Sequence, residues 1–278
     1  MPPPDPSPRD PMLDSTPINP ATPADTPEGL DGGSTDDALV GSWRILQPRK
    51  GHRWSTDDLL CAWFARDTMT RLQRTPDRAL DLGCGLASVA LMLAWCWPEL
   101  MVTGLEKQPH RLDLARRSVA RNGCGPRVHL WLGDVAEAPM VFWDQPRWPL
   151  VTATPPYWPP ATGTHTTDDK ARCRFDLLGD VETYARVVPA LLAPDGIFVM
   201  VYDGRQRERL ARATLGLVPL RKRAVIAREG DPPLLVLGAW GLIGPGDLQE
   251  EPPLLLRHRD GRRSDAFRAL RTEMGMPA

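Results

Sequence analysis

The sequence predicts an α/β fold in which a central, mostly parallel sheet of seven strands carries helices on both faces and ends in an antiparallel strand pair. Short apolar runs alternate with longer helical patterns from residue 78 to residue 240, as in proteins built from repeated strand–helix–strand units. The run 196–201 is apolar throughout, which is typical of a strand buried on both faces. Hydrophobic residues make up 42% of the chain, enough to fill the core of such a domain.

Residues 1–38 differ in composition from the rest and are predicted to form a disordered, acidic arm. Ten prolines fall between Pro2 and Pro27, and up to Asp37 there are eight acids against one base, Arg9. Because large apolar residues are scarce here, the segment cannot bury enough surface to offset the entropy of ordering. Residues 39–278 form the predicted domain and carry 33 bases against 27 acids, a mildly basic balance that is compatible with an anionic partner.

The first half of the domain contains three predicted strands and three predicted helices. The helix over 56–72 has apolar residues on one face and Ser55 or Thr56 as its cap. A mostly apolar helix over 86–97 and an amphipathic helix over 108–121 follow it. The strands predicted in this half are 78–82, 100–105 and 127–132.

The second half of the domain contains four predicted strands and two predicted helices. Residues 155–179 are predicted to be a long irregular connection, of the kind that usually serves a function in a compact domain. Helices are predicted over 180–192 and 205–215. The strands are 148–153, 196–201, 220–227 and 234–240, of which the last two form the antiparallel pair.

Hydropathy, cysteine and histidine patterns exclude several classes of protein. The longest apolar stretch, 86–97, is too short to cross a bilayer, and the N-terminus shows no pattern of a secretory signal. The five cysteines form no Cys-x-x-Cys pair, and the five histidines show no metal-ligand spacing. The sequence therefore predicts a cytoplasmic protein without a membrane span, a disulfide framework or a metal site.

A glycine-rich turn, Asp81-Leu-Gly-Cys-Gly85, follows the first strand of the sheet. In open α/β sheets, ligands bind beyond the carboxyl ends of the strands. Gly83 and Gly85 let the backbone approach a ligand closely, and the N-terminus of the next helix favours polar or anionic groups. The turn is a defective dinucleotide fingerprint, because Ser88 occupies the third glycine position. A plain tight turn is the alternative interpretation.

Acidic residues follow the next two strands. Glu106 lies 21 residues after Gly85, where a carboxylate can accept hydrogen bonds from both hydroxyls of a ribose. Asp134 follows the third strand and can accept from an adenine amino group, although it can equally cap the next helical turn. With the glycine turn, these acids indicate a ligand that contains a nucleoside.

This spacing resembles the motifs of class I S-adenosylmethionine-dependent methyltransferases, which read as an acid, GxGxG, a ribose acid and an acid near the adenine. The resemblance implies a Rossmann-like fold and S-adenosylmethionine as the cofactor. Ala87 departs from the usual last glycine of GxGxG. Binding of NAD is the nearest competing interpretation. The implied cofactor-binding residues are Asp81, Gly83, Gly85, Glu106 and Asp134.

The segment Thr154-Pro-Pro-Tyr157 comes directly after the fourth strand and resembles the (N/D/S)-P-P-(Y/F/W) motif of methyltransferases that act on planar amino groups. Such a nitrogen is a poor nucleophile, because its lone pair is delocalised into the ring. Hydrogen-bond acceptors around its N–H groups, here Thr154 and the carbonyl of Pro155, hold it in line with the methyl donor. Pro155 and Pro156 fix the turn, and Tyr157 offers a face for base stacking.

A basic and aromatic cluster precedes the first helix. It consists of Arg49, Lys50, His52, Arg53 and Trp54, and this combination suits phosphate contact followed by base stacking in an RNA substrate. Ordinary solvated charge is the alternative. More bases occur late in the chain, at Arg221, Lys222, Arg223, Arg228, Arg257, Arg259, Arg262 and Arg263.

Over residues 39–270 the chain resembles the bacterial tRNA(Val) adenine-N6-methyltransferase family. The most specific part is the segment from Gln47 to Asp57, Gln-Pro-Arg-Lys-Gly-His-Arg-Trp-Ser-Thr-Asp. Asp57 resembles the family position near the methionine end of the cofactor, although it can also be a first-turn helix charge. Further matching segments are Leu80–Gly85, Asn122-Gly123, Ala171-Arg172 and Pro253–Gly261. The departures are Ala87, Ser118, Thr154 and Arg262-Arg263.

The resemblance divides the domain into a basic N-terminal segment with a helix (39–77), a Rossmann-like core (78–245) and a C-terminal extension (246–278). It implies methyl transfer to an amino nitrogen, with adenine N6 in tRNA or other RNA as the leading acceptor. Three alternatives stay open at this point: a methyltransferase for a protein glutamine amide or a small molecule, a non-catalytic cofactor- or RNA-binding protein, and an NAD-dependent oxidoreductase.

Overall fold

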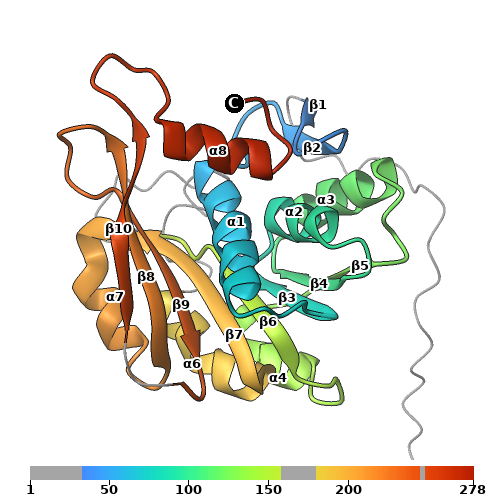
Figure 1. The fold of residues 1–278 in the computed structure, drawn as a ribbon. Coiled ribbons are helices and arrows are strands. Elements are labelled where there is room, and N and C mark those ends of the chain that lie inside the picture. Colours follow the sequence, from blue (N-terminus) through green and yellow to red (C-terminus); the bar gives the residue numbers. More distant parts are fainter. Residues whose placement is uncertain (1–32, 158–179, 245–247) are drawn as a thin grey trace, which may run out of the picture. The chain divides into compact units, whose positions relative to one another are not determined.

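The computed structural model describes residues 33–157, 180–244 and 248–278. The predicted arm up to residue 32, and residues 158–179 of the predicted irregular connection, lie outside the described residues. The described part contains a central sheet with helices on both of its faces and a short hairpin beside it (Figure 1).

The central sheet contains, within the described residues, eight strands in the order β10-β8-β9-β7-β6-β3-β4-β5. The strands agree closely with the predicted ones, and two of them have the predicted bounds. In chain order they are β3 (Arg78–Leu82), β4 (Met101–Glu106), β5 (Val128–Leu132), β6 (Trp148–Ala153), β7 (Leu192–Asp203), β8 (Val218–Arg228), β9 (Leu235–Gly241) and β10 (Gln249–Arg257).

Strand pairing makes one half of the sheet parallel and introduces antiparallel pairs in the other. Strand β3 lies between β4 and β6 and is parallel to both. Strand β9 is antiparallel to β7 and to β8. Strands β8 and β9 are the antiparallel pair that the sequence predicts. The chain runs from β3 outward through β4 to β5, and then returns to the other side of β3 as β6. The strand order therefore reverses between β3 and β6. Open α/β sheets bind ligands beyond the strand ends at such a point.

The eighth strand, β10, lies at the edge of the sheet and is parallel to β8. With β10 the sheet has eight strands in the described residues, one more than the seven predicted. Its register shifts between Glu251 and Leu254, across two consecutive prolines. Proline cannot donate to a strand ladder and is confined to edges and bulges, so this segment gives a weak strand signal by itself.

Seven α-helices and two short 3₁₀ helices surround the sheet in the described residues. The helices are α1 (Thr56–Arg71), α2 (Ser88–Cys96), α3 (Pro109–Arg121), α4 (Ala138–Val141), α6 (Val181–Leu191), α7 (Arg207–Ala213) and α8 (Asp265–Glu273), with η1 (Val135–Glu137) and η4 (Gly204–Gln206). Among the described helices none is long and apolar enough to cross a membrane.

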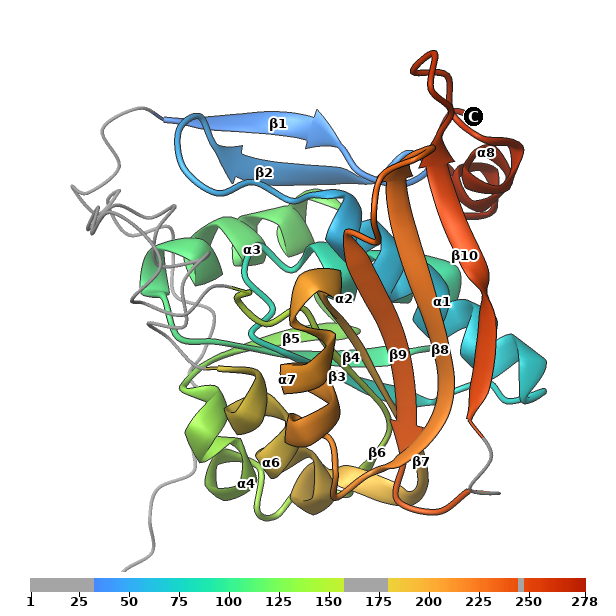
Figure 2. The ribbon, with the colours of Figure 1, turned by 90° about the vertical axis from the view of Figure 1, so that its left-hand side faces the viewer.

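The helices cover both faces of the sheet. The side chains of β7, which alternate between the two faces, show which helices cover each face. Val199 and Val201 join the core that α1, α2, α3 and α8 cover, whereas Phe198 and Met200 join the core under α4, α6 and α7. Figure 2 shows α3 and α4 on opposite sides of the strands. Since both faces are covered, the apolar run of β7 is buried throughout, as predicted.

The hairpin of β1 (Ser34–Ala38) and β2 (Arg44–Pro48) corrects the predicted extent of the disordered arm. Residues 34–38 were expected to be disordered, but they pair antiparallel with β2. The backbone of Arg44 is held on both sides by the Asn122 side chain, at 2.8 and 2.7 Å, after helix α3. Local composition misled the prediction because the partner strand and its anchor lie further along the chain.

Helix α8 was not predicted and packs on the same face as α1. Its buried Phe267 and Leu270 join the core there, and the Ser264 side chain caps its N-terminus. Glu273 near its C-terminal end accepts a hydrogen bond of 3.0 Å from the indole nitrogen of Trp63 in α1. The C-terminal extension therefore continues the domain core.

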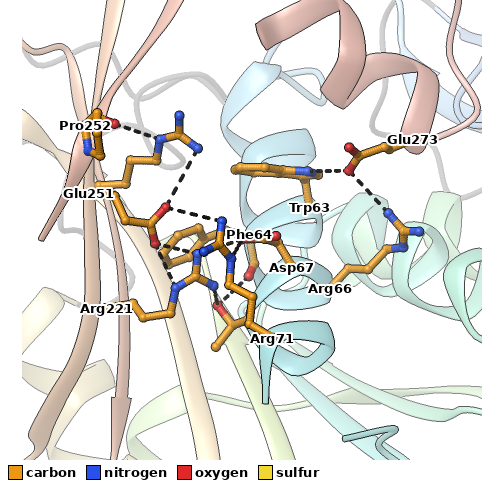
Figure 3. Close-up of polar contacts among 11 residues, drawn as sticks. Trp63, Phe64, Arg66, Asp67, Arg71, Arg221, Glu251, Pro252 and Glu273 are labelled. Atoms are coloured by element: carbon orange, nitrogen blue, oxygen red, sulfur yellow. Dashed lines mark hydrogen bonds and ion pairs between the residues drawn. The ribbon is translucent and has the colours of Figure 1, made fainter. Parts of the chain in front are cut away.

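A buried ion cluster joins α1 to β8 and β10 (Figure 3). The Arg221 guanidinium donates to Asp67 at 2.6 Å, to Thr68 at 2.6 Å and to Glu251, and lies over the ring of Phe64 at 4.6 Å. Arg221, one of the bases noted late in the chain, is only 5% exposed and so is not available for contact with an RNA phosphate. A residue buried this deeply among acids holds the fold together.

Candidate active site

Two turns meet at the point where the strand order reverses. Leu82, the last residue of β3, is in register with Ala153, the last residue of β6. The glycine turn starts at the next residue of the first strand, Gly83, and the Thr-Pro-Pro-Tyr turn starts at the next residue of the second, Thr154. Parallel pairing therefore places the two predicted motifs side by side.

A pocket that is open to solvent lies between these turns. Six of the predicted site residues line it, namely Trp54, Gly83, Gly85, Glu106, Thr154 and Pro156. The other lining residues are His52, Asp58, Cys84, Leu86, Ser88, Lys107, Gln108, Arg111, Val135 and Tyr184.

The glycine turn needs a left-handed backbone at three alternate positions. Gly83 has φ +66° and Gly85 has φ +58°, and a Cβ on Gly83 would collide with the hydroxyl of Tyr184. Ala87, which stands at the last glycine position of the motif, also has φ +61°. A non-glycine residue in this region is strained by about 1 kcal/mol or more. Alanine keeps the geometry of the turn at that cost.

Glu106 is 5% exposed at the end of β4 and faces the pocket. One carboxylate oxygen accepts from the backbone N–H of Gly85 at 2.9 Å, and the other accepts from the N–H of Gln108 at 2.7 Å. Each oxygen has a second lone pair, so the carboxylate can still accept one further hydrogen bond on each side. Two ribose hydroxyls would fit this capacity.

Asp134 does not line the pocket; its neighbours Val135 and Lys107 do. Its carboxylate caps η1 by accepting from the N–H of Ala136 at 3.0 Å, and it forms an ion pair of 2.5 Å with Lys107. Burial acts to raise the pKa of Asp134, but the hydrogen bonds from Lys107 and Ala136 lower it overall. The helix-cap interpretation of this residue therefore describes what it does in this structure, and its role toward an adenine stays a prediction.

Asp81 is buried beneath the pocket. One oxygen accepts a hydrogen bond of 2.8 Å from Thr152 in β6, which couples the ends of the two central strands. The other, Oδ2, is buried without a hydrogen-bond partner in the described residues. Burial raises the pKa of Asp81 to about 7, against the opposing effect of the Thr152 hydrogen bond. Asp81 does not line the pocket, so it can act on a bound ligand only through the residues around it.

The side chain of Tyr157 anchors the Thr-Pro-Pro-Tyr turn to neighbouring elements. The Tyr157 hydroxyl donates to Asp57 in α1 at 2.6 Å, and its ring meets Tyr202 edge-on, with centroids 5.6 Å apart. Gln206 donates to the Tyr157 carbonyl. Thr154, Pro156 and Tyr157 are half-buried, whereas Pro155 is buried. Stacking of a base on Tyr157 stays a prediction.

Helix α1 begins with two adjacent acids, of which the sequence singled out only the first. Asp57 contacts Tyr157 and does not line the pocket, whereas Asp58 does. Asp58 also completes a capping box with Ser55, whose N–H donates to it at 3.0 Å. Burial raises the pKa of Asp57, and it raises that of Asp58 to about 6. The capping box was readable from the sequence, but the direction of the Asp58 side chain was not.

The predicted basic cluster separates into three environments. Trp54 lines the pocket, and its backbone N–H donates to the side-chain oxygen of Gln47 at 2.9 Å. Arg53 is engaged by Asp37 at 2.8 Å and by the Pro48 carbonyl at 3.0 Å, both from the hairpin. Arg49 and Lys50 are exposed. Only these last two keep the exposure that contact with a phosphate requires.

Arg111 is a pocket residue that the sequence analysis missed. It is 5% exposed, and it donates to the His52 carbonyl at 3.3 Å and lies against Gly85. It brings a buried positive charge toward Asp58 and so opposes the rise of that residue's pKa. A charge on the buried side of an amphipathic helix was the available signal. Across the described ranges, no three His, Cys, Asp or Glu side chains gather as metal ligands would.

Comparison with known sequences identifies relatives with a common activity. No family model matches the chain. A tRNA1(Val) (adenine(37)-N6)-methyltransferase of Yersinia enterocolitica is 31% identical over 141 residues, which cover 49% of this chain and 53% of that protein. An enzyme of the same name from Porphyromonas gingivalis is 27% identical over 66% of this chain and 71% of its own length. The chain thus spans about half the length of the first relative.

A shorter similarity is to an enzyme whose name gives a different acceptor. A release factor glutamine methyltransferase of Geobacter sulfurreducens is 38% identical over 92 residues, which cover 32% of this chain and 30% of that protein. Glutamine amides and adenine amino groups are both planar nitrogens, so this relative does not separate the two acceptor classes.

Solved structures support the fold. A predicted O-methyltransferase from Agrobacterium tumefaciens superposes with a TM-score of 0.61 at 18% identity, over 80% of this chain and 98% of that one. A SAM-dependent methyltransferase from the same organism gives 0.51 at 13% identity, over 78% and 72%. The predicted Rossmann-like α/β architecture is confirmed. The chain is a sequence relative of the tRNA1(Val) (adenine(37)-N6)-methyltransferases and has the fold of the Rossmann-like methyltransferases.

Proposed function

We propose that this protein is an S-adenosylmethionine-dependent methyltransferase that methylates an amino nitrogen, with adenine N6 in tRNA as the acceptor. One observation carries the proposal: the register of Leu82 with Ala153 puts the glycine turn and the Thr-Pro-Pro-Tyr turn on one pocket, with Gly83 and Thr154 in its lining. A methyl donor and a planar acceptor must meet within bonding reach, and adjacent strand ends supply that proximity.

The residues on the cofactor side fit S-adenosylmethionine. Gly83 and Gly85 have the left-handed backbone of the turn and line the pocket, and Glu106 beside them retains acceptor capacity for a ribose. The buried Asp81 lacks a partner for one oxygen beside this turn. We assign Glu106 to the ribose, Gly83 and Gly85 to the backbone cradle, and Asp134 with Val135 to the adenine side. Asp57 and Asp81 then act from behind the pocket wall.

The acceptor side supplies hydrogen-bond acceptors and shape. In this proposal, Thr154 Oγ1 and the carbonyl of Pro155 accept from the amino group and turn its lone pair toward the methyl group. Pro156 and Tyr157 fix the turn that presents them. Tyr157 is held by Asp57 and Tyr202, which supports a turn of defined geometry.

Bound S-adenosylmethionine would supply a methyl group on a sulfonium, and transfer would leave the neutral thioether. Thr154 and the Pro155 carbonyl would orient the acceptor nitrogen so that its lone pair could form the new N–C bond as the S–C bond broke and its electrons remained on sulfur. The methylated nitrogen then loses one proton to water, because it becomes acidic when it carries the positive charge. No strong general base is required of this chain.

The choice of tRNA rests on the relatives and on the rim of the pocket. Both relatives described above as adenine methyltransferases act, by name, on a tRNA. Trp54 on the pocket wall offers a stacking surface, and the exposed Arg49 and Lys50 lie a few residues before it. We place the reaction in the cytoplasm, where tRNA is available.

Labelled S-adenosylmethionine, the full-length chain and RNA substrates test this function. Total cellular RNA and an unmodified valine tRNA transcript are each incubated with the protein, digested and analysed by nucleoside mass spectrometry. We expect N6-methyladenosine in both, with binding of the transcript that weakens as salt rises. Transfer of label to protein but not to RNA would overturn the assignment of the acceptor, and absence of cofactor binding in calorimetry would overturn the function itself.

A release factor glutamine amide is the second candidate acceptor. It is favoured by the 38% identity to the Geobacter enzyme over a segment of 92 residues. The same labelled assay with a purified release factor in place of RNA separates the two. Methylation of the release factor with no salt-dependent RNA binding would establish this candidate in place of tRNA.

A further inference from the structure

The first residue of the Thr-Pro-Pro-Tyr turn has a carboxylate beside it. Thr154 Oγ1 lies 3.5 Å from Asp58 Oδ1, at the long end of hydrogen-bond distance, and both residues line the pocket. The other Asp58 oxygen accepts from the Ser55 N–H at 3.0 Å, which fixes the carboxylate as part of the α1 cap. Catalytic hydrogen bonds of this length often shorten when the substrate binds.

The direction of the Thr154 proton decides what the hydroxyl can do for a substrate. A threonine hydroxyl has one proton and two lone pairs, so it can either donate or accept toward the pocket. An ionised carboxylate can only accept. If the Thr154 proton points to Asp58, only lone pairs of Oγ1 remain for a substrate N–H group.

We propose that Asp58 is a positioning residue that makes Thr154 a pure hydrogen-bond acceptor, so that the threonine–carboxylate pair performs the role that an asparagine or aspartate performs in related turns. This inference rests on the proposed methylation of an amino nitrogen. The pair would place an acceptor oxygen at the first position of the turn although the side chain there is shorter and carries no carbonyl.

Several charged groups from other elements face Asp58 and affect its ionisation. Asp57 precedes it in α1 and Asp81 faces it from β3, and both negative charges disfavour the carboxylate. Arg111 from α3 favours it, as does a hydrogen bond from Ser88 in α2. The pKa of about 6 leaves Asp58 mainly ionised at neutral pH.

A double-mutant cycle on Asp58 and Thr154 tests the pair. D58N keeps an oxygen for the Ser55 cap but turns an amide N–H toward Thr154, which reverses the hydrogen bond. We expect D58N and T154V each to lower kcat about 10-fold, with the KM for S-adenosylmethionine within about 3-fold. Since both break the same contact, D58N should add less than about 2-fold in the T154V background. An equal loss in both backgrounds would overturn the proposal, because Asp58 would then act without Thr154.

A second measurement does not depend on activity. The Asp58 carboxyl is titrated by carbon-13 NMR in the wild type and in T154V, with thermal unfolding as a check on folding. Loss of a donated hydrogen bond should raise the proton affinity of Asp58 about threefold, and an unchanged titration overturns the proposal. If wild-type protein methylates neither RNA nor release factor, the proposed function fails, whereas the titration still decides whether Asp58 and Thr154 are coupled.

Discussion

Helix α1 carries inward-facing acids at both ends, but the acids at the two ends have different partners. At its C-terminal end, Asp67 is bonded to Arg221, which also binds Glu251, so positive and negative charges face each other (Figure 3). At its N-terminal end, burial raises the pKa of Asp57 and Asp58, and Asp81 lies near them. No basic side chain is hydrogen-bonded to Asp57 or Asp58 in the described contacts.

This difference separates structure from function along one helix. Buried charge that is fully paired fixes α1 against β8 and β10, and its removal should cost stability. Buried charged groups that lack close opposite charges lower the stability of the folded state, and such groups are common at functional sites. Changes at the pocket end should therefore alter catalysis, and changes at the Arg221 end should alter the free energy of unfolding.

The largest effect is expected at Tyr157. Tyr157→Ala removes the hydroxyl that Asp57 holds and the ring packed on Tyr202, so methyl transfer should become undetectable while the Kd for S-adenosylmethionine changes only a few-fold. Single-turnover assays and calorimetry measure the two quantities. Tyr157→Phe, which keeps the ring, separates loss of the turn from loss of the hydroxyl. An equal loss of cofactor binding and transfer would contradict the assigned role.

At the other end of α1, Arg221→Met should lower the free energy of unfolding by about 3 kcal/mol, because it leaves Asp67 and Glu251 without their main partner. Urea denaturation measures this. The matched control is Lys222→Ala at the next position, whose ion pair with Glu250 at 3.5 Å is exposed and should contribute less than about 1 kcal/mol. Cofactor affinity of Arg221→Met should stay at the wild-type value; a strong decrease would show that the two ends are not independent.

The acids at the pocket end should make stability depend on pH. The pKa of Asp81 is raised from 3.8 to about 7 on folding, so the folded state binds more protons than the unfolded state between these values. The stabilisation is therefore complete below about pH 4 and is lost as the pH rises toward 7. We expect unfolding in urea to require about 2 kcal/mol less at pH 8 than at pH 5. Asp81→Asn, which can still accept from Thr152, should remove the share of this dependence that is due to Asp81, and the raised pKa values of Asp57 and Asp58 should leave a remainder of the same sign.

A smaller effect is expected for cofactor binding at Glu106. Glu106→Gln keeps one acceptor oxygen but places an amide N–H where the other oxygen accepts from a backbone N–H. The affinity for S-adenosylmethionine should fall about 10-fold, equivalent to about 1.4 kcal/mol, with kcat at saturating cofactor little changed. Calorimetry provides the measurement. An unaltered Kd would remove Glu106 from the ribose site.

The smallest effect is expected for Thr154→Asn. An asparagine supplies its own carbonyl acceptor, so kcat should rise by a few-fold and should become less sensitive to D58N. Steady-state rates with an RNA acceptor measure the change. Collapse of activity would show that the hydroxyl serves another chemistry.

The sequence by itself determined most of the elements and the order of the motifs. Apolar runs gave β3 and β6 with their observed bounds, because a strand buried on both faces needs consecutive apolar residues. The glycine turn and the acid at Glu106 were recognisable for a similar local reason: a left-handed backbone and a carboxylate at a strand end are set by residue type and spacing.

Only the tertiary structure decided which polar side chains face the pocket and which hold the fold together. Asp57 and Asp58 are neighbours with the same side chain, yet only Asp58 lines the pocket. Arg221 and Arg49 are both arginines, yet one is buried among acids and the other is exposed. Such assignments depend on partners far away in the chain, because the energy of a charged group is set by the burial and the counter-charges that packing brings to it.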